Sequence, residues 1–140
     1  MKVEFQLNDA LFRQAVAEVA RPTIRRAIRE LKSRMQARFQ LPKGGRYYYR
    51  PTTAGFGGFQ ARGGKYRASA KGEAPAIRTG KLFASLNESY PSDFEGVLMI
   101  NTSYAAILED PAKLDRPFVR PSIAETIAAM SGGGKFISIL

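Results

Sequence analysis

Apolar side chains recur about every 3.6 residues between positions 11 and 39, which is the period of an amphipathic helix. Asn8 and Asp9 stand just before this pattern, as a helix N-cap and a negative charge at the positive end of the helix dipole. Pro22 lies inside the pattern and removes one backbone hydrogen bond. The pattern therefore predicts one long helix with a kink, or two helices that meet within residues 20–23.

Three further segments have the character of strands. Residues 3–7 alternate apolar and polar side chains, which predicts a short strand. Residues 89–100 predict an antiparallel strand pair with a turn at Pro91–Asp93. The apolar and partly β-branched C-terminus follows a run of glycines, so 132–140 predicts a flexible strand that docks on a sheet edge of this subunit or of a neighbour.

Helical patterns also occur in the second half of the chain. Thr79 can cap a short helix that buries Leu82 and Leu86 one turn apart, and residues 104–108 predict a second short helix. After Pro117 a last helix is expected, with three apolar residues on its inner face: Ile123, Ile127 and Met130. The order of elements predicts a single α+β domain over 1–140, with the N-terminal and C-terminal helices packed on a small antiparallel sheet.

A glycine-rich and tyrosine-rich stretch, 43–72, follows neither a helical nor a sustained strand period. A loop of this length in a compact domain is usually functional or disordered. We interpret it as a functional arm, as a β-hairpin with a flexible tip, or as a segment that is disordered until assembly. Residues 47–50 and 65–68 are the candidate legs of the hairpin.

The formal charge of +10 is concentrated around this arm. No Asp or Glu occurs between Glu30 and Glu73, and the Lys and Arg residues elsewhere equal the acidic residues in number. The sequence therefore predicts one strongly cationic face or arm on a balanced body.

Composition argues against catalysis, because the chain has no cysteine and no histidine. Thiolate nucleophiles, the usual zinc ligands and the commonest general base are thereby excluded. Glu109, Asp110 and Asp115 are the only candidate metal ligands, and we expect them to pair with Arg116 or Arg120 instead. We predict a non-enzyme without metal, cofactor or membrane segment; an endonuclease or lytic enzyme would need a carboxylate constellation that the chain barely offers.

Three stretches carry a resemblance to a known family. They are Ala70 to Leu82 with its Gly-Glu-Ala-Pro and Thr-Gly-x-Leu steps, Tyr104 to Glu109, and the Arg-Pro-Phe-Val-Arg-Pro run of 116–121. In this order and spacing they resemble the neck, head-tail joining and tail-completion proteins of long-tailed bacteriophages, the minor tail protein Z-like group. The N-terminal half matches only in layout, a long helix followed by a variable basic loop.

The resemblance implies a structural virion protein without catalytic activity, assembled in the bacterial host cytoplasm and located in the phage neck. It implies a homo-oligomeric ring, for which we expect a hexamer. Its implied partners are the tail terminator, the tail tube and the head-connector or adaptor proteins. Non-specific contact with genomic DNA in the channel is a separate alternative, which rests on the cationic stretch.

Arginine and tyrosine are enriched at protein interfaces, so we expect the arm to contact other subunits more than DNA. The Arg-Pro-Phe run adds Phe118 as a core anchor, with two flanking arginines that can bond carboxylates of a neighbouring subunit. The candidate interface residues are Arg46, Tyr47, Tyr48, Tyr49, Arg50, Phe56, Phe59, Arg62, Lys65, Tyr66, Arg67, Arg116, Phe118 and Arg120.

A role in DNA contact is the alternative for the cationic residues. The candidate DNA-facing residues are Arg25, Arg29, Lys32, Arg62 and Lys65, although an ordinary solvent-exposed helix face also explains the first three. The competing function is a monomeric nucleic-acid-binding module that uses the basic aromatic loop. The oligomeric state distinguishes the two functions, because the module is monomeric and the neck protein forms a ring.

Overall fold

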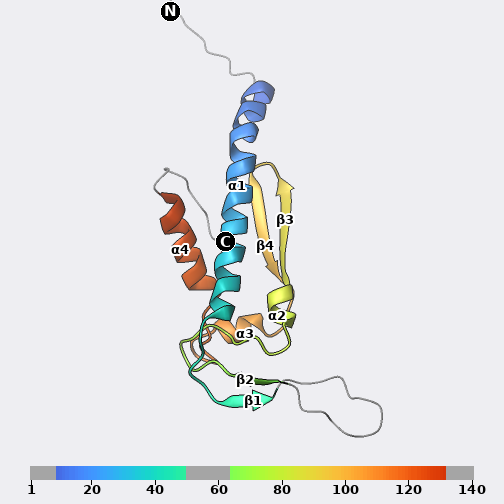
Figure 1. Ribbon diagram of the computed structural model, residues 1–140. Coiled ribbons are helices and arrows are strands. Elements are labelled where there is room, and N and C mark those ends of the chain that lie inside the picture. The colour runs from blue at the N-terminus through green and yellow to red at the C-terminus, as the bar shows by residue number, and fades with distance from the viewer. Residues whose placement is uncertain (1–8, 50–63, 132–140) are drawn as a thin grey trace, which may run out of the picture.

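The computed structural model describes residues 9–49 and 64–131 and has an α+β fold, as the element order predicts (Figure 1). The strand predicted at 3–7 and the C-terminal strand predicted at 132–140 lie outside the described residues. None of the helices within the described ranges combines the length and the apolar character needed to cross a bilayer.

The long predicted helix is α1 (Asp9–Gln40), and it continues through Pro22 without a break. The alternative of two separate helices is therefore wrong. Pro22 is exposed, so solvent can replace the backbone hydrogen bond that proline removes. The hydroxyl of Thr23 donates a hydrogen bond of 3.1 Å to the carbonyl oxygen of Val19 in the same turn.

Two separate hairpins make up the strands. The first pairs β1 (Tyr47–Tyr49) with β2 (Lys65–Arg67), and the second pairs β3 (Leu86–Ser92) with β4 (Glu95–Ile100), both antiparallel. Figure 1 shows the β3–β4 hairpin alongside the middle of α1 and the β1–β2 hairpin beyond the C-terminal end of α1. Both legs of the predicted arm hairpin are confirmed.

The β3–β4 hairpin lies close against α1. At Gly96 a Cβ atom would come within 2.7 Å of side-chain carbons of Ile24 and Ile28, so only glycine allows this approach. The register is irregular between Ser89 and Ser92, and the turn falls at residues 93–94, later than predicted. Pro91 sits in this irregular part of β3, where proline is tolerated in a strand.

Two short helices connect the hairpins to the C-terminal part. α2 (Lys81–Ala84) is shorter than predicted, because Leu86 is buried as the first residue of β3 and not on the helix. The Thr79 hydroxyl accepts a hydrogen bond of 3.3 Å from the backbone N–H of Lys81. α3 (Ala105–Glu109) forms where a short helix was predicted.

The core lies where α1, α3 and the start of α4 meet below the β3–β4 hairpin. The Phe39 ring is 5.2 Å from that of Phe118 and 6.2 Å from that of Phe83, measured between centroids. Such tilted aromatic pairs contribute beyond the area that they bury. The buried apolar cluster comprises Met35, Phe39, Ala74, Leu86, Ala105 and Phe118.

The last helix, α4 (Val119–Ser131), packs against α1 through small polar residues. Ser122 and Thr126 are almost completely buried, and their hydroxyls donate to carbonyl oxygens one turn earlier, at 2.6 and 2.7 Å. This corrects the predicted inner face of the helix. The three apolar residues expected there are only partly buried: Ile123, Ile127 and Met130.

Charged side chains join α1 to α4 at the edge of this contact. The Arg38 guanidinium donates to the Ser122 hydroxyl at 3.1 Å and forms an ion pair with Glu125. Arg34 approaches the same Glu125 carboxylate at 3.5 Å. Two cations of the stretch between Glu30 and Glu73, which has no acidic residue, therefore hold the C-terminal helix.

Glu109, at the end of α3, caps the start of α4. Its carboxylate accepts hydrogen bonds from the backbone N–H groups of Phe118, Val119 and Arg120 at 2.8, 3.0 and 2.9 Å. These are N–H groups at a helix start that lack helical partners, and the negative charge also suits the helix dipole. The expected pairing of Glu109 with an arginine side chain is therefore wrong, because the carboxylate is taken by backbone donors.

We predict that Glu109→Ala lowers the free energy of unfolding by about 1–2 kcal/mol, because it leaves these N–H groups without an acceptor. Urea denaturation followed by circular dichroism measures the loss. Glu95→Ala is the matched control, since Glu95 is exposed and its carboxylate has no partner among the described residues, and it should change stability by less than about 0.5 kcal/mol. Equal effects of the two substitutions would refute the capping role.

Candidate functional site

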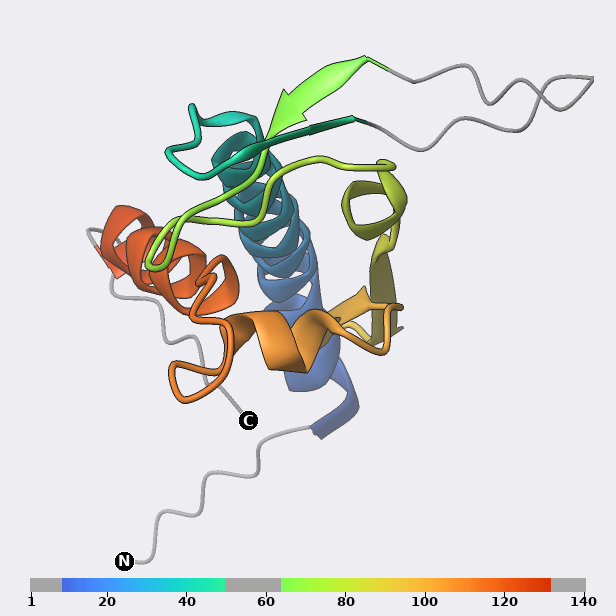
Figure 2. The same cartoon turned by 90° about the horizontal axis from the view of Figure 1, so that it is seen from below.

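The β1–β2 hairpin exposes its aromatic side chains on both of its faces. Tyr47, Tyr48 and Tyr49 are 59%, 49% and 53% exposed, although successive residues of a strand point to opposite sides. Figure 2 shows the hairpin projecting to one side of the body. The exposed tyrosines give this arm surface for a partner. Contact with a partner would also stabilise the arm, because an isolated two-stranded hairpin is only marginally stable in water.

The two cations of β2 contact a tyrosine of β1. The Lys65 ammonium lies 4.8 Å from the Tyr47 ring centroid, and the Arg67 guanidinium lies 5.3 Å from it. The Tyr48 and Tyr66 rings are 6.1 Å apart between centroids. Cation–π and ring contacts of this kind keep the exposed side chains in one arrangement without burying them.

The root of the arm is held by Glu73. Its carboxylate accepts hydrogen bonds from the backbone N–H groups of Gly44, at 2.9 Å, and Ala70, at 2.7 Å, and so joins the two ends of the arm. The Arg67 guanidinium donates to the carbonyl oxygens of Gly45 and Gly44 at 2.9 and 3.2 Å. The direction of the hairpin is therefore fixed where it leaves the body.

Gly45 is required for this geometry. Its N–H donates to the Ala68 carbonyl oxygen at 2.9 Å, and the Ala68 N–H donates to Arg46 at 2.8 Å. A Cβ atom on Gly45 would lie 2.4 Å from the Ala68 carbonyl oxygen, which a real side chain does not tolerate. Any larger residue at position 45 must push the two strands apart.

The hydrogen bonds from Gly44 and then Ala70 hold the pKa of the Glu73 carboxyl below its ordinary value. Partial burial lowers the pKa of Lys43, whose ammonium donates to the carbonyl oxygen of Arg38 at 2.9 Å. At the root, an ionised carboxylate thus binds backbone donors, and a lysine caps the C-terminal end of α1.

The structure separates the predicted interface residues into distinct groups. Arg46 and the hairpin residues named above lie on the exposed arm, whereas Arg50, Phe56, Phe59 and Arg62 lie outside the described residues. Phe118 is completely buried in the core, which confirms its prediction as a core anchor, whereas its inclusion among the partner contacts is wrong.

The two arginines beside Phe118 behave differently from each other. The Arg116 guanidinium donates to the carbonyl oxygens of Leu114 and Asp115 in its own loop. Arg120 is exposed, and its side chain has no partner within residues 9–49 and 64–131. Of the pair, Arg120 keeps its guanidinium available to another subunit.

The predicted DNA-facing residues of α1 meet the β3–β4 hairpin. Lys32 Nζ lies 3.3 Å from Glu88 Oε1, and Arg29 Nε lies 3.8 Å from Glu88 Oε2. The Tyr90 hydroxyl donates to Glu88 at 2.8 Å, and this bond and then Lys32 lower the pKa of that carboxyl. Lys32 is mostly buried in this contact, so it is a poor phosphate ligand, whereas Arg29 keeps 67% of its side chain exposed.

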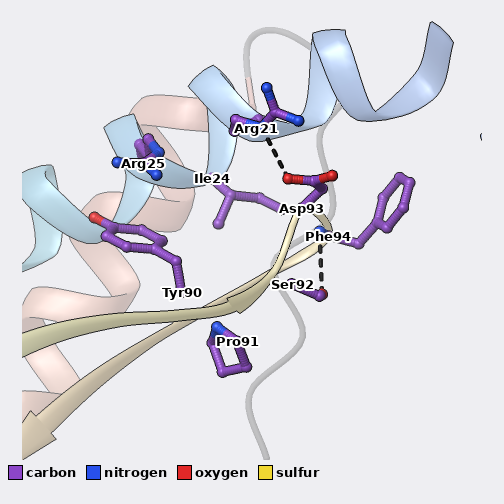
Figure 3. Close-up of a pocket in the computed structure, with 8 residues that line it drawn as sticks. All are labelled: Arg21, Ile24, Arg25, Tyr90, Pro91, Ser92, Asp93 and Phe94. Carbon is purple, nitrogen blue, oxygen red and sulfur yellow. Dashed lines mark hydrogen bonds and ion pairs between the residues drawn. The ribbon is translucent and has the colours of Figure 1, made fainter. Parts of the chain in front are cut away.

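A hollow of about 420 Å³ lies where the β3–β4 turn meets α1 (Figure 3). There Arg21 Nε donates to Asp93 Oδ1 at 2.8 Å, which lowers the pKa of the Asp93 carboxyl. The Arg25 guanidinium lies 4.6 Å from the Tyr90 ring centroid. Both arginines are engaged with the β3–β4 hairpin, so the hollow is a junction between this hairpin and α1. Phe94 lies half-exposed at its rim.

Among the described residues, no carboxylate of the predicted acidic cluster pairs with the side chain of Arg116 or Arg120, so that expectation is wrong. Glu109 caps α4, while Asp110 accepts the backbone N–H of Ala112 at 2.9 Å and lies 3.7 Å from Lys113 Nζ. Within the described ranges, no three His, Cys, Asp or Glu side chains are placed to hold a metal ion.

The pattern of the sequence did not reveal the roles of Glu73 and Glu109. Both lie in the stretches that carry the family resemblance, and that is the one signal that could have drawn attention to them. No family model, curated protein or solved structure matches this chain, so its place in the phage neck family stays a prediction.

We predict that the amide resonances of Gly44 and Ala70 titrate together with a pKa below the ordinary glutamate value of about 4.3. Because the folded pKa of Glu73 is lowered, the stability of the root is fully present above the unfolded pKa and is lost as the pH falls through the folded one. NMR spectra recorded between neutral and acidic pH measure this titration. Glu73→Gln should abolish it and Glu95→Gln should not; a titration at the ordinary value would contradict the account.

Proposed function

We propose that this chain is a non-enzymatic structural protein of the phage neck, which joins the head connector to the tail or completes the tail end as a ring of subunits. The observation that carries the proposal is the projecting β1–β2 hairpin, fixed at its root and exposed on both faces. The resemblance of 70–82, 104–109 and 116–121 to neck proteins supplies the location.

The three stretches of the resemblance contribute to one structural unit. The Gly72 N–H donates to the Asp115 carbonyl oxygen at 2.7 Å, which ties the first stretch to the loop before the third. Glu109 of the second stretch caps the helix that the third begins. Ala74, Ala105 and Phe118, one from each stretch, share the buried cluster. A motif set that builds one core supports a shared fold with neck proteins, and the arm is then the part that contacts neighbours.

In this proposal the arm reaches an adjacent subunit of the ring. Tyrosine and arginine provide large contact areas at interfaces, and here they are held in place by the root before any partner binds. Ordering the arm in advance lowers the entropic cost of assembly. The expected oligomer is a hexamer, with tail terminator, tail tube and connector or adaptor proteins as neighbours.

The competing function, a monomeric nucleic-acid-binding module that uses the basic aromatic loop, is less well supported. Lys65 and Arg67 both lie over the Tyr47 ring, and Arg67 is also bonded to the backbone of the root. These contacts occupy one of the faces that a stacked base would need.

We predict that Gly45→Ala weakens subunit association by about tenfold or more, the equivalent of about 1.4 kcal/mol, because the new Cβ forces the arm out of its direction. Mass photometry and analytical ultracentrifugation of the purified chain measure association, and the yield of infectious particles from a strain that supplies the variant measures function. Circular dichroism should show a folded body, since Gly45 lies outside the core cluster.

Gly64→Ala is the matched control on the same arm, because no atom of residues 9–49 and 64–131 lies within 4 Å of a Cβ atom there. It should assemble as the unchanged protein does. If Gly45→Ala also assembles normally and gives full particle yield, the arm does not join subunits. If the chain stays monomeric even when it is mixed with its head and tail partners, the ring itself is refuted.

A further inference from the structure

One side of α1 is not covered by any other described element. The β3–β4 hairpin covers the side that carries Ile24 and Ile28, and α4 covers the side that carries Arg34 and Arg38. Figure 1 shows α4 and this hairpin on opposite sides of α1. Exposed residues spaced three or four apart mark the remaining side, here called the open face: Val19, Pro22, Arg26, Arg29, Ser33, Ala37 and Gln40.

The open face is cationic, and none of the seven residues that mark it is acidic. Its middle is a hollow of about 520 Å³ lined by Pro22, Arg25, Arg26, Arg29, Glu30 and Ser33. The acid at its border, Glu30, lies 2.8 Å from Arg34 Nη2 and is thereby neutralised by another residue. Arg26 has no ion pair within the described residues, and the 3.8 Å contact of Arg29 is long and mostly exposed, hence weak.

We propose that the open face of α1 binds the phosphate backbone of DNA without sequence preference. A guanidinium presents a planar fork of N–H donors that matches phosphate oxygens. Arg26 and Arg29 are three residues apart, or about 4.5 Å along the helix axis, so the two side chains can reach neighbouring phosphates of one strand. The small side chains of Ser33 and Ala37 allow the backbone of DNA to approach the helix closely.

The distribution of charge favours DNA over a second copy of the chain. Most acidic groups of the described residues are already used internally, as caps or ion pairs. The carboxylates that accept no hydrogen bond and form no ion pair there are Glu18, Glu95 and Asp115, and Glu18 still interacts electrostatically with Arg21. A second copy with a charge of +10 would bring few free anions to this face.

This inference differs from the DNA contact expected from the sequence alone. It replaces Lys32, which is engaged with Glu88, by Arg26, and it uses none of the arm residues. It also does not require a ring, because the open face belongs to a single subunit. DNA binding can therefore fail while ring formation succeeds, and the reverse also holds.

Fluorescence anisotropy with a labelled 30-base-pair duplex over a series of salt concentrations tests the proposal on the full chain. The logarithm of the association constant should fall linearly with that of the salt concentration. Arg26→Ala with Arg29→Ala should reduce this slope by about 1.8, since each lost phosphate contact removes about 0.9. Alanine favours helices, so the double variant should keep the helical content seen by circular dichroism.

Lys71→Ala with Lys81→Ala is the control of equal charge, because both lysines are exposed and neither belongs to α1. It should change the slope by less than half as much, and Arg26→Lys with Arg29→Lys should preserve the slope. The proposal is wrong if the unchanged chain does not bind duplex at low salt, or if the lysine control loses as much as the arginine variant. If polyglutamate competes as well as unlabelled duplex at the same concentration of charge, the partner is instead an acidic protein.

Discussion

The burial of Phe118 against Phe39 is the contact on which the rest of the structure depends. Phe39 lies in the last turn of α1, just before the chain leaves for the arm, and Phe118 lies immediately before α4. Glu109 binds the backbone N–H of Phe118, so the same residue is held through both its ring and its backbone. This contact holds the end of α1, the start of α4 and the origin of the arm together. The arm has a defined direction because its origin is fixed in this way.

A second constraint is how the acidic side chains are used. Glu73, Glu109 and Glu125 bind backbone donors or arginines within the fold, and each joins two different elements or loops. The net charge of +10 is therefore not spread evenly, because the anions are occupied inside while the arm and the open face of α1 keep exposed cations. We propose assembly through the arm and contact with DNA along α1 as two uses of this excess, and the two surfaces are different.

Local patterns predicted much of the fold. The 3.6-residue period predicted α1, and β-prone residues beside turn residues predicted both hairpins. The inner face of α4 was predicted wrongly, because close packing against α1 selects Ser122 and Thr126, whose hydroxyls are satisfied by their own helix. The positions of Glu73 and Glu109 depend on contacts between separate elements, which no local period encodes. For the same reason Lys32 and Arg26 could not be distinguished from the sequence, since only the fold brings Glu88 to one and leaves the other exposed.

The central claim, a ring of these subunits at the neck, is tested most directly by electron microscopy of virions that carry a labelled copy of this chain. The account predicts label at the junction of head and tail, in a closed ring whose subunits touch through the β1–β2 hairpin. Label elsewhere in the particle, or virions that contain none of the chain, would contradict it.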